Sequence, residues 1–556
     1  LPMADPISAT VAAVSVAVKT AVGASLAALP FVGATAAYGA GSAVASAVVS
    51  YSTLFTVAGF AASALLSPQV DIQGSPTDWR AEPNAGIPFV MGERATSGII
   101  VHRDAYGLDN RLQSIVTVYS GAGPIQSFDQ FYADDVAMSF DGNGEATNGG
   151  NFAGNMWLYT TPGDQPQSAA LANDSILNSQ IGSNAFDGWG STSRISGKAH
   201  ALLTLRQDSK LKTYAGGIPR TRFKLRGIKM YDPRLDSTVA GGSGSHRVAD
   251  QSTYTYSENP AIAALNWALG LKENGVVVGG IGAEVDGIDL PAFIEWANVC
   301  DANGWTVSAV PTSADDKHQV LLALMQAGGA RYSRFQGKIS CIVRTPRTSV
   351  VTLSADDTAG PFEVDLEADR LTRTNTITPR CVMESHAWEM VAQDPVNEAS
   401  YVTADGGERS RGIDYPYVSI KASNANKDQP SQLAAYAIVD SRETIAGTVP
   451  LKPWGAQIEP GDVFTIDEPG FLLDGVELLC VRRDFDLANN IVRISFISES
   501  AGKHDYALGL DPTPPNAPGL TAPDIYTVDP PGIGVWSAVA GTGNQPTVQV
   551  SGDADQ

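Results

Sequence analysis

Cysteine is scarce in this chain, with only four residues among 556. The surroundings of these cysteines are mostly apolar, and no two of them stand at the short spacing of a zinc site or a disulfide framework. We therefore expect buried free thiols and no bound metal. The four positions are Cys300, Cys341, Cys381 and Cys480.

Positive charge is also in short supply. Lys and Arg number 37 against 59 Asp and Glu, which gives a net charge of −22. Proteins that wrap nucleic acid need clustered Lys and Arg to neutralise phosphates, so this composition argues against that class. Solubility alone explains an acidic surface. An acidic wall would equally let DNA pass without binding, because like charges repel.

Catalytic patterns are missing as well. The histidines are scattered, no Ser lies in a G-x-S-x-G elbow, and "ESHAWEM" (Glu384, His386, Glu389) lacks the second helical His of a zinc protease. Paired carboxylates such as Asp134-Asp135 and Asp356-Asp357 read as turns or opposite strand faces. We assign no catalytic residue and predict that the chain is not an enzyme.

Two loops imitate ligand sites without completing them. "DGNGEA" at 141–146 resembles a calcium loop but lacks Gly at the sixth position, and Phe152 stands where a bidentate Glu belongs. "VVVGGIGAEVDG" resembles a dinucleotide fingerprint, yet Val285 replaces its third glycine. Both are interpreted as turns, so we predict no cofactor-binding and no metal-binding residues.

The N-terminal region lacks charge altogether between Lys19 and Asp71. No Lys or Arg precedes the apolar run, which argues against a signal peptide. Two hydrophobic helices, about 11–29 and 42–66, would be separated by Pro30 and several glycines. Each is long enough to cross a bilayer, but their Ala, Gly and Ser content favours close packing between helices. A membrane span and burial inside an assembly both remain open.

The rest of the chain is mainly β with an α+β insertion. At about 100–200 residues per domain, we expect several domains. Residues 71–235 predict a β-rich domain, with two strands around a turn at 93–97 and long loops over 141–190. Residues 236–348 predict an α+β domain. The boundaries proposed are 1–70, 71–235, 236–348, 349–505 and 506–556.

Helix signals are clear in the α+β domain. Asn259-Pro260 starts one helix, a second follows Asp289 and closes at Asn303-Gly304, and a third follows Asp315-Asp316. A hairpin should turn at Gln336-Gly337. Residues 349–505 return to strands with one helix over about 430–446. A Pro-rich linker, "LDPTPPNAPGLTAPD", then precedes the C-terminal segment.

The stretch "FKLRGIKMYDPRLDSTVAGGSGSHRVADQSTYTYSENPAIAALNWALG" carries the most specific pattern. A strand ends at Tyr231, Asp232-Pro233-Arg234 forms a turn, and a Gly/Ser loop leads to the Asn259-Pro260 helix start. We expect Asp232 and Arg234 to act as local fold determinants that bond the backbone or each other. The arrangement resembles the tail-tip or host-specificity protein J family of long-tailed phages.

Further segments follow in the order of that family. They are "PFVMGERATSGIIV", "GAGPIQSFDQFYADDVAM", "GWGSTSRISGKAHALLTL", "GIDLPAFIEWANVCD", "LLALMQAGGARYSRFQGKISCIV" and "KPWGAQIEPGDVFTID". The resemblance covers roughly residues 80–530. Little of the family's fibre or receptor-binding region is present, which leaves the choice of receptor open.

The resemblance implies a baseplate hub at the virion tail tip: a homotrimer whose tube-like β-barrel domains close the tail tube, with a fibre or fibronectin-like region starting at the C-terminus. Implied partners are the distal tail protein and tail tube, the tape-measure protein, other baseplate proteins, the host cell surface, and genomic DNA passing without specific binding. Residues 11–67 would pack inside the tail and contact a membrane only during infection. The alternatives are a membrane-anchored surface adhesin and the hub of a gene-transfer agent or tailocin.

Overall fold

The computed structural model describes most of residues 85–513, together with 536–540 and 548–552; the gaps are 108–109, 173–188, 208–213, 215–216, 362, 367–371, 424, 468–472, 474 and 511–512. The chain divides into two units, Leu1–Pro518 and Gly519–Gln556. Among the described residues, no helix has the length and apolar character needed to span a membrane. The expected hydrophobic helices within 11–67 lie outside the described residues.

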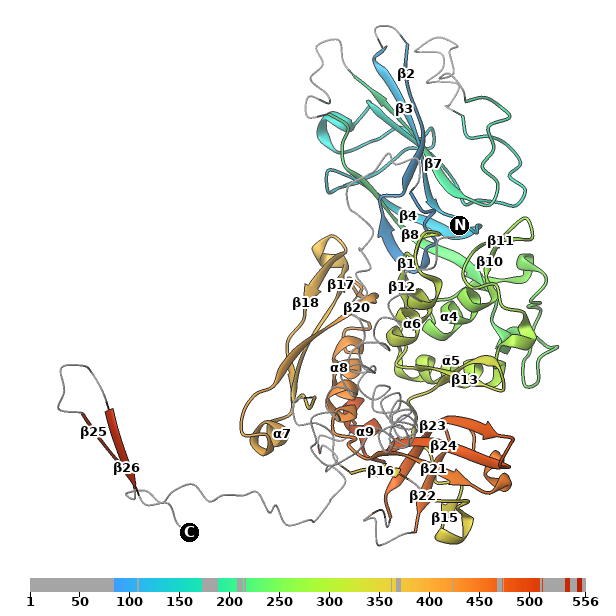
Figure 1. Cartoon of the computed structure of the whole chain (residues 1–556). Coiled ribbons are helices and arrows are strands. Elements are labelled where there is room, and N and C mark those ends of the chain that lie inside the picture. The colour runs from blue at the N-terminus through green and yellow to red at the C-terminus, as the bar shows by residue number, and fades with distance from the viewer. Residues whose placement is uncertain are drawn as a thin grey trace, which may run out of the picture. The chain divides into compact units, whose positions relative to one another are not determined.

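Two sheets form the first β-rich region of the larger unit (Figure 1). One has the order β12-β1-β8-β4-β5, with β9 also pairing with β8; the other has the order β2-β3-β7-β6. The bounds of the first are Met91–Thr96 (β1), Ile125–Ala133 (β4), Val136–Met138 (β5), Thr221–Met230 (β8), Thr255–Tyr256 (β9) and Ser308–Ala309 (β12). The bounds of the second are Ile99–Tyr106 (β2), Leu112–Ser120 (β3), Met156–Thr161 (β6) and Ala199–Arg206 (β7).

The prediction of a turn at 93–97 is wrong, because Glu93 and Arg94 lie inside β1. The Glu93 carboxylate stands 3.0 Å from Lys224 Nζ of β8, and Arg94 Nη1 donates to the carbonyl of Ser308 at 3.5 Å. These partners stabilise two charges within a buried strand. The chain turns later, at Gly98, whose φ of 67° favours glycine. The loops expected over 141–190 are also interrupted, by β6.

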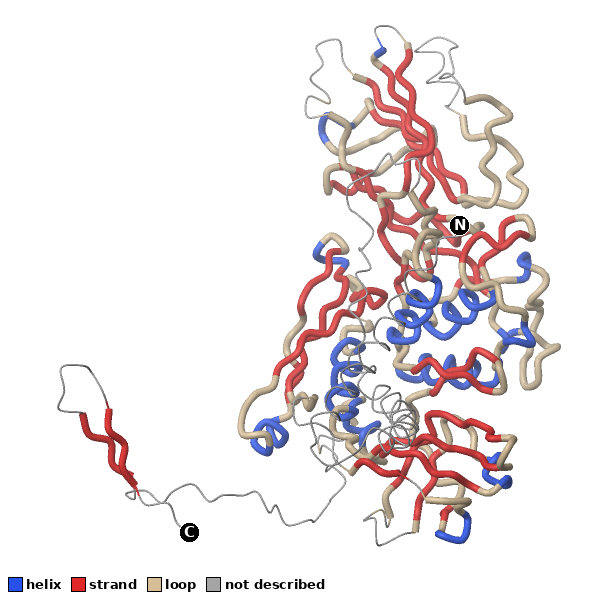
Figure 2. Tube along the Cα trace, viewed as in Figure 1, coloured by secondary structure: helices blue, strands red, loops and turns tan. Residues whose placement is uncertain are grey.

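The α+β part forms as the sequence predicts. Helix α4 (Pro260–Leu269) begins after Asn259, α5 (Leu290–Asn303) ends at Gly304, and α6 (Lys317–Ala327) begins after Asp316. Hairpin β13–β14 (Arg331–Phe335 and Lys338–Ile342) turns at Gln336-Gly337, both with positive φ. A second hairpin is β10–β11 (Leu271–Glu273 and Val276–Gly279). Figure 2 shows these helices gathered together among the strands.

A four-stranded sheet follows, with β17 (Thr376–Met383) pairing with β18 (Glu389–Ala392), β19 (Val396–Asn397) and, in parallel, β20 (Ser410–Ile420). Helix α8 (Gln429–Asp440) packs against it. The helix expected over about 430–446 therefore ends six residues early, because Ala446 starts β21 (Ala446–Leu451) and pairs with Ile497. Two short helices were not expected: α7 (Ala399–Ala404) and α9 (Lys503–Ala507).

The last sheet of the larger unit has the order β15-β22-β23-β24-β21-β16. Its bounds are Thr352–Leu353 (β15), Glu363–Asp365 (β16), Val463–Ile466 (β22), Glu477–Asp486 (β23) and Ile491–Ser498 (β24), with β21 as above. One segment touches both ends of the sheet: β15 pairs with β22, while Thr358 and β16 pair with β21. The sheet thus curls around its own apolar core, which includes Phe464 and Phe496.

The largest hydrophobic core of this unit extends from Phe89 to Ala507 and includes residues of α4, α5, α6, β17, β20 and α8. It therefore runs across the expected boundaries at 235/236 and 348/349, which stay predictions. The smaller unit contains one described hairpin, β25 (Trp536–Ala540) with β26 (Val548–Gly552). The fold is mainly β with helices; closure into a tube stays a prediction.

Candidate functional site: two buried polar networks

The turn after β8 contains the residues that the sequence singled out. Asp232 caps the short 3-10 helix Pro233–Leu235: its Oδ1 accepts the backbone N–H of Arg234 at 3.0 Å. The Arg234 guanidinium also lies 2.8 Å from Asp232 Oδ2. The two charges bond each other and the backbone, as expected, and their role as local fold determinants stays a prediction.

Arg234 also connects this turn to two helices. Its Nη1 donates to Asp301 of α5 at 2.6 Å. The other oxygen of Asp301 accepts from the side-chain amide of Asn259 at 2.7 Å. Asn259 in turn caps α4 by accepting from the N–H of Ala261 at 2.9 Å. One chain of charge-assisted hydrogen bonds therefore ties the end of β8 to the start of α4 and the end of α5.

Residues distant in sequence complete the network. The Asn266 amide accepts from the Tyr231 N–H at 2.9 Å and donates to the Tyr231 carbonyl at 2.8 Å, as a paired strand would. His246 Nδ1 accepts the Asp232 N–H at 3.1 Å, which leaves the proton of the neutral ring on Nε2, facing the Thr255 hydroxyl at 3.2 Å. Burial lowers the pKa of His246 and favours this neutral form.

The geometry of this network suits a structural role. Tyr231, Asp236 and His246 are each 2% exposed, so a substrate has no access to them. Burial raises the pKa of Tyr231, whose hydroxyl donates to Asp236 at 2.8 Å. Buried ion-pair networks perturb pKa values just as catalytic sites do, so these shifts do not mark a catalytic site. The network orients backbone and fixes a turn.

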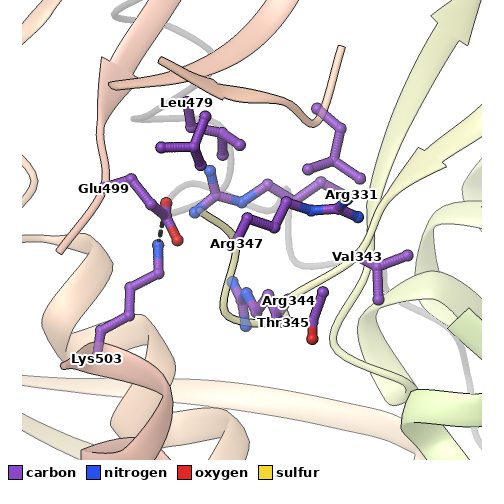
Figure 3. Close-up of a pocket in the computed structure, with 10 residues that line it drawn as sticks. Arg331, Val343, Arg344, Thr345, Arg347, Leu479, Glu499 and Lys503 are labelled. Carbon is purple, nitrogen blue, oxygen red and sulfur yellow. Dashed lines mark hydrogen bonds and ion pairs between the residues drawn. The ribbon is translucent and has the colours of Figure 1, made fainter. Parts of the chain in front are cut away.

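The second network, here called the Asp440 cluster, comprises Asp440, Arg331, Arg344, Lys503 and Glu499. Asp440 Oδ2 accepts from Arg331 at 2.7 Å and Arg344 at 2.6 Å, while Lys503 Nζ lies 2.5 Å from Glu499. These residues come from α8, β13, the chain after β14, the chain after β24, and α9. Figure 3 shows Arg331, Arg344, Lys503 and Glu499 around one small space.

Electrostatics explains how these buried charges coexist. The pKa of Asp440 is held far below its ordinary value: burial opposes ionisation, but the charges of Arg331, Arg344 and Lys503 outweigh it. The pKa of Glu499 is lowered and that of Lys503 raised in the same way, with the partner charge overcoming burial. The cavity beside the cluster has a volume of about 10 Å³, enough for roughly one water molecule.

The other residues that the sequence flagged do not assemble into a site. Asp141 Oδ1 accepts the N–H groups of Asn143 and Glu145, so the calcium-like loop is a turn. Asp134 and Asp135 both have positive φ in the β4–β5 turn, and Glu384 pairs with Lys224 at 2.6 Å. Among the described residues, no three His, Cys, Asp or Glu side chains are arranged to hold a metal ion.

The cysteines agree with their prediction, since all four are buried and free. Burial raises the pKa of each thiol, in the case of Cys381 to about 12. A thiol with a raised pKa is a poor nucleophile.

Sequence reasoning missed the Asp440 cluster and the partners of Tyr231. Asp440 ends the apolar run "LAAYAIVD", and Lys503-His504 follows the apolar strand β24. A charge that closes an apolar run was the only available signal. This signal does not reveal which residue of opposite charge will pair with Asp440, because the partners lie up to about 110 residues away in the sequence.

Comparison with known proteins adds a likeness of fold. No family model matches the chain, and no curated protein matches it. A chain of the virion of a native gene transfer agent particle aligns over 84% of this chain and 97% of its own length, with a TM-score of 0.50 and 15% identity. That likeness shows a shared fold.

Two further solved structures are similar at lower scores. The 43 kDa tail protein of prophage MuSo2 from Shewanella oneidensis aligns over 36% of this chain and 55% of its own, with a TM-score of 0.23 and 15% identity. A tail protein from Neisseria meningitidis aligns over 75% and 98%, with a TM-score of 0.27 and 11% identity. At these TM-scores neither adds to the argument.

Proposed function

We propose that this chain is a structural protein of a virion tail, and more specifically the hub that closes the tail tube at its tip. The observation that carries the proposal is the fold shared with the gene transfer agent virion chain over 84% of this chain and nearly the whole of that one. The motifs in host-specificity protein J order, with the Asp232–Arg234 turn among them, support the finer assignment.

The proposed assembly is a homotrimer that contacts the distal tail protein, the tail tube, the tape-measure protein and other baseplate proteins. A symmetric assembly would cover the edge strands of the sheets, such as β15 and β16. The net charge of −22 suits a channel through which DNA passes without binding. Residues 11–67 would face the tape-measure protein and contact the host membrane during infection.

The two buried networks support a structural role in place of catalysis. Each joins elements that are far apart in sequence, and central residues of each, such as Asp236 and Asp440, are buried. We therefore assign no catalytic group and no cofactor.

A second candidate is the hub of a gene transfer agent, and the likeness to a chain of a gene transfer agent virion favours it. The physical role would be the same, since both particles pass DNA through a tail. The two differ in cargo: sequencing DNA from purified particles distinguishes random host fragments from a single viral genome.

The test is localisation in particles. Antibodies against residues 85–510 should label the tail tip in electron micrographs of purified particles, and deletion of the gene should abolish complete tails. Complementation with the wild-type gene is the control. Recovery of the chain in host membranes, with normal tails in the deletion strain, would instead support the membrane-anchored adhesin and refute the hub.

A further inference from the structure

Helix α9 occupies a particular place along the chain. It spans only Lys503–Ala507 and is the last helix or strand described in the larger unit. After Leu510 the chain continues to the smaller unit, whose described part is the β25–β26 hairpin. The smaller unit is therefore joined to the larger one by the chain that follows α9.

Despite its length, α9 is deeply seated. Lys503 and His504 are each 2% exposed, and Ala507 is 3% exposed. Lys503 Nζ lies 2.5 Å from Glu499 and 3.5 Å from Asp440. His504 Nδ1 faces the Tyr436 hydroxyl of α8 at 3.1 Å, and its Nε2 faces Glu499 at 3.2 Å.

One more bond fixes the end of this helix. The Tyr506 hydroxyl donates to Glu398, the residue before α7, at 3.0 Å. A helix of five residues is too short to persist by its own backbone bonds, since helices below about 12 residues are marginal in water. The conformation of α9 therefore depends on these tertiary contacts, and their loss would unfold it as a unit.

We propose that α9 is a detachable anchor, through which the C-terminal unit is coupled to the Asp440 cluster. Seated, α9 supplies the cation that neutralises Glu499 and shares Asp440 with Arg331 and Arg344. Released, it withdraws Lys503 and leaves Asp440 facing Arg331 and Arg344 with one partner fewer. The element thus has two states, and tension or docking at the C-terminal unit would select the released one.

The geometry also explains why release should be all-or-none. Lys503 lies between Glu499 and Asp440, so a partial shift that loses Asp440 would leave a buried ammonium with one carboxylate fewer, which is costly. Because Asp440 bonds both arginines, the β13–β14 hairpin should respond when α9 leaves. This coupling goes beyond the proposed function, since it holds whichever particle contains the chain.

Hydrogen exchange on the full chain tests the anchor. In wild type, amides of 499–510 should exchange by an opening separate from, and faster than, that of β21 and β24. Lys503→Met, which keeps the length of the side chain without its charge, should speed exchange of 499–510 by at least about tenfold and also speed that of β13–β14. Asp505→Asn, on the exposed face of the same helix, is the matched control and should change neither.

Single-molecule pulling from the C-terminus supplies the second readout. We expect an early step that releases about 12 residues, or roughly 40 Å of chain, before the β24 sheet yields. Lys503→Met should lower the force of that step alone. If 499–510 exchanges only with β21 and β24, or if the first step already includes the sheet, α9 is an ordinary part of the core and the proposal is wrong. Exchange of 499–510 without any effect on β13–β14 would equally refute the coupling.

Discussion

Replacing Asp232 with Ala should destabilise the junction of β8, α4 and α5 by an amount that the structure allows us to work out. The substitution removes the cap of the 3-10 helix, worth about 1 kcal/mol. It also removes charged hydrogen bonds to Arg234, worth about 1.5–3 kcal/mol. Because Arg234 keeps its bond to Asp301 and its side chain is 23% exposed, we take the lower end of that range of hydrogen-bond energies. We expect a loss of about 2.5 kcal/mol in the free energy of unfolding.

Asp232→Asn is the matched control. Its amide oxygen can still accept the Arg234 N–H and cap the turn, whereas the charge is lost. The expected cost is about 1 kcal/mol. Urea unfolding monitored by Trp fluorescence suits the measurement, because Trp267 and Trp296 lie in α4 and α5. A lower midpoint at an unchanged denaturant slope reports stability alone.

A double-mutant cycle isolates the ion pair itself. Asp232→Ala and Arg234→Met should each destabilise the chain, and the double variant should cost about 1–2 kcal/mol less than the two costs added together. In particles, Asp232→Ala should reduce assembly without removing any chemical activity. Equal losses for Asp232→Ala and Asp232→Asn, additivity in the cycle, or normal assembly with a lost activity would refute this reasoning.

Three further predictions follow from burial, packing and symmetry. Burial lowers the pKa of His246 and His200, so at low pH the unfolded chain binds protons that the folded chain does not. The free energy of unfolding should therefore be full above about pH 6.5 and fall as the pH drops below that value. Unfolding midpoints measured from pH 7.5 to 5 check this, and a flat profile would contradict it. Trp296→Ala removes a fully buried ring and its hydrogen bond to the Gly328 carbonyl, and should lower the free energy of unfolding in urea by about 3–5 kcal/mol. Val350→Ala, at an exposed position, is the control and should change this free energy by less than about 0.5 kcal/mol. Similar effects of the two substitutions would contradict the role of packing. Cross-linking and mass photometry of purified tails should give trimers of this chain, and only monomers or dimers would refute the three-fold hub.

Several elements could be predicted from sequence because their partners are neighbours along the chain. The caps of α4 and α6 are satisfied within three residues of Asn259 and Asp316. The Gln336-Gly337 turn follows from local backbone preference, and the Asp232–Arg234 pair spans two residues. Such interactions need no knowledge of the fold, since chain connectivity already places the atoms together.

Tertiary structure decided what depends on distant partners. Glu93 and Arg94 belong to a strand and not a turn because Lys224 pairs with Glu93 and the Ser308 carbonyl accepts from Arg94, across more than 130 and 210 residues. Ala446 leaves the expected helix because Ile497 offers strand pairing. The Asp440 cluster draws on five segments between 331 and 503. A buried charge is tolerated only beside an opposite one, and only the folded chain determines which charges meet.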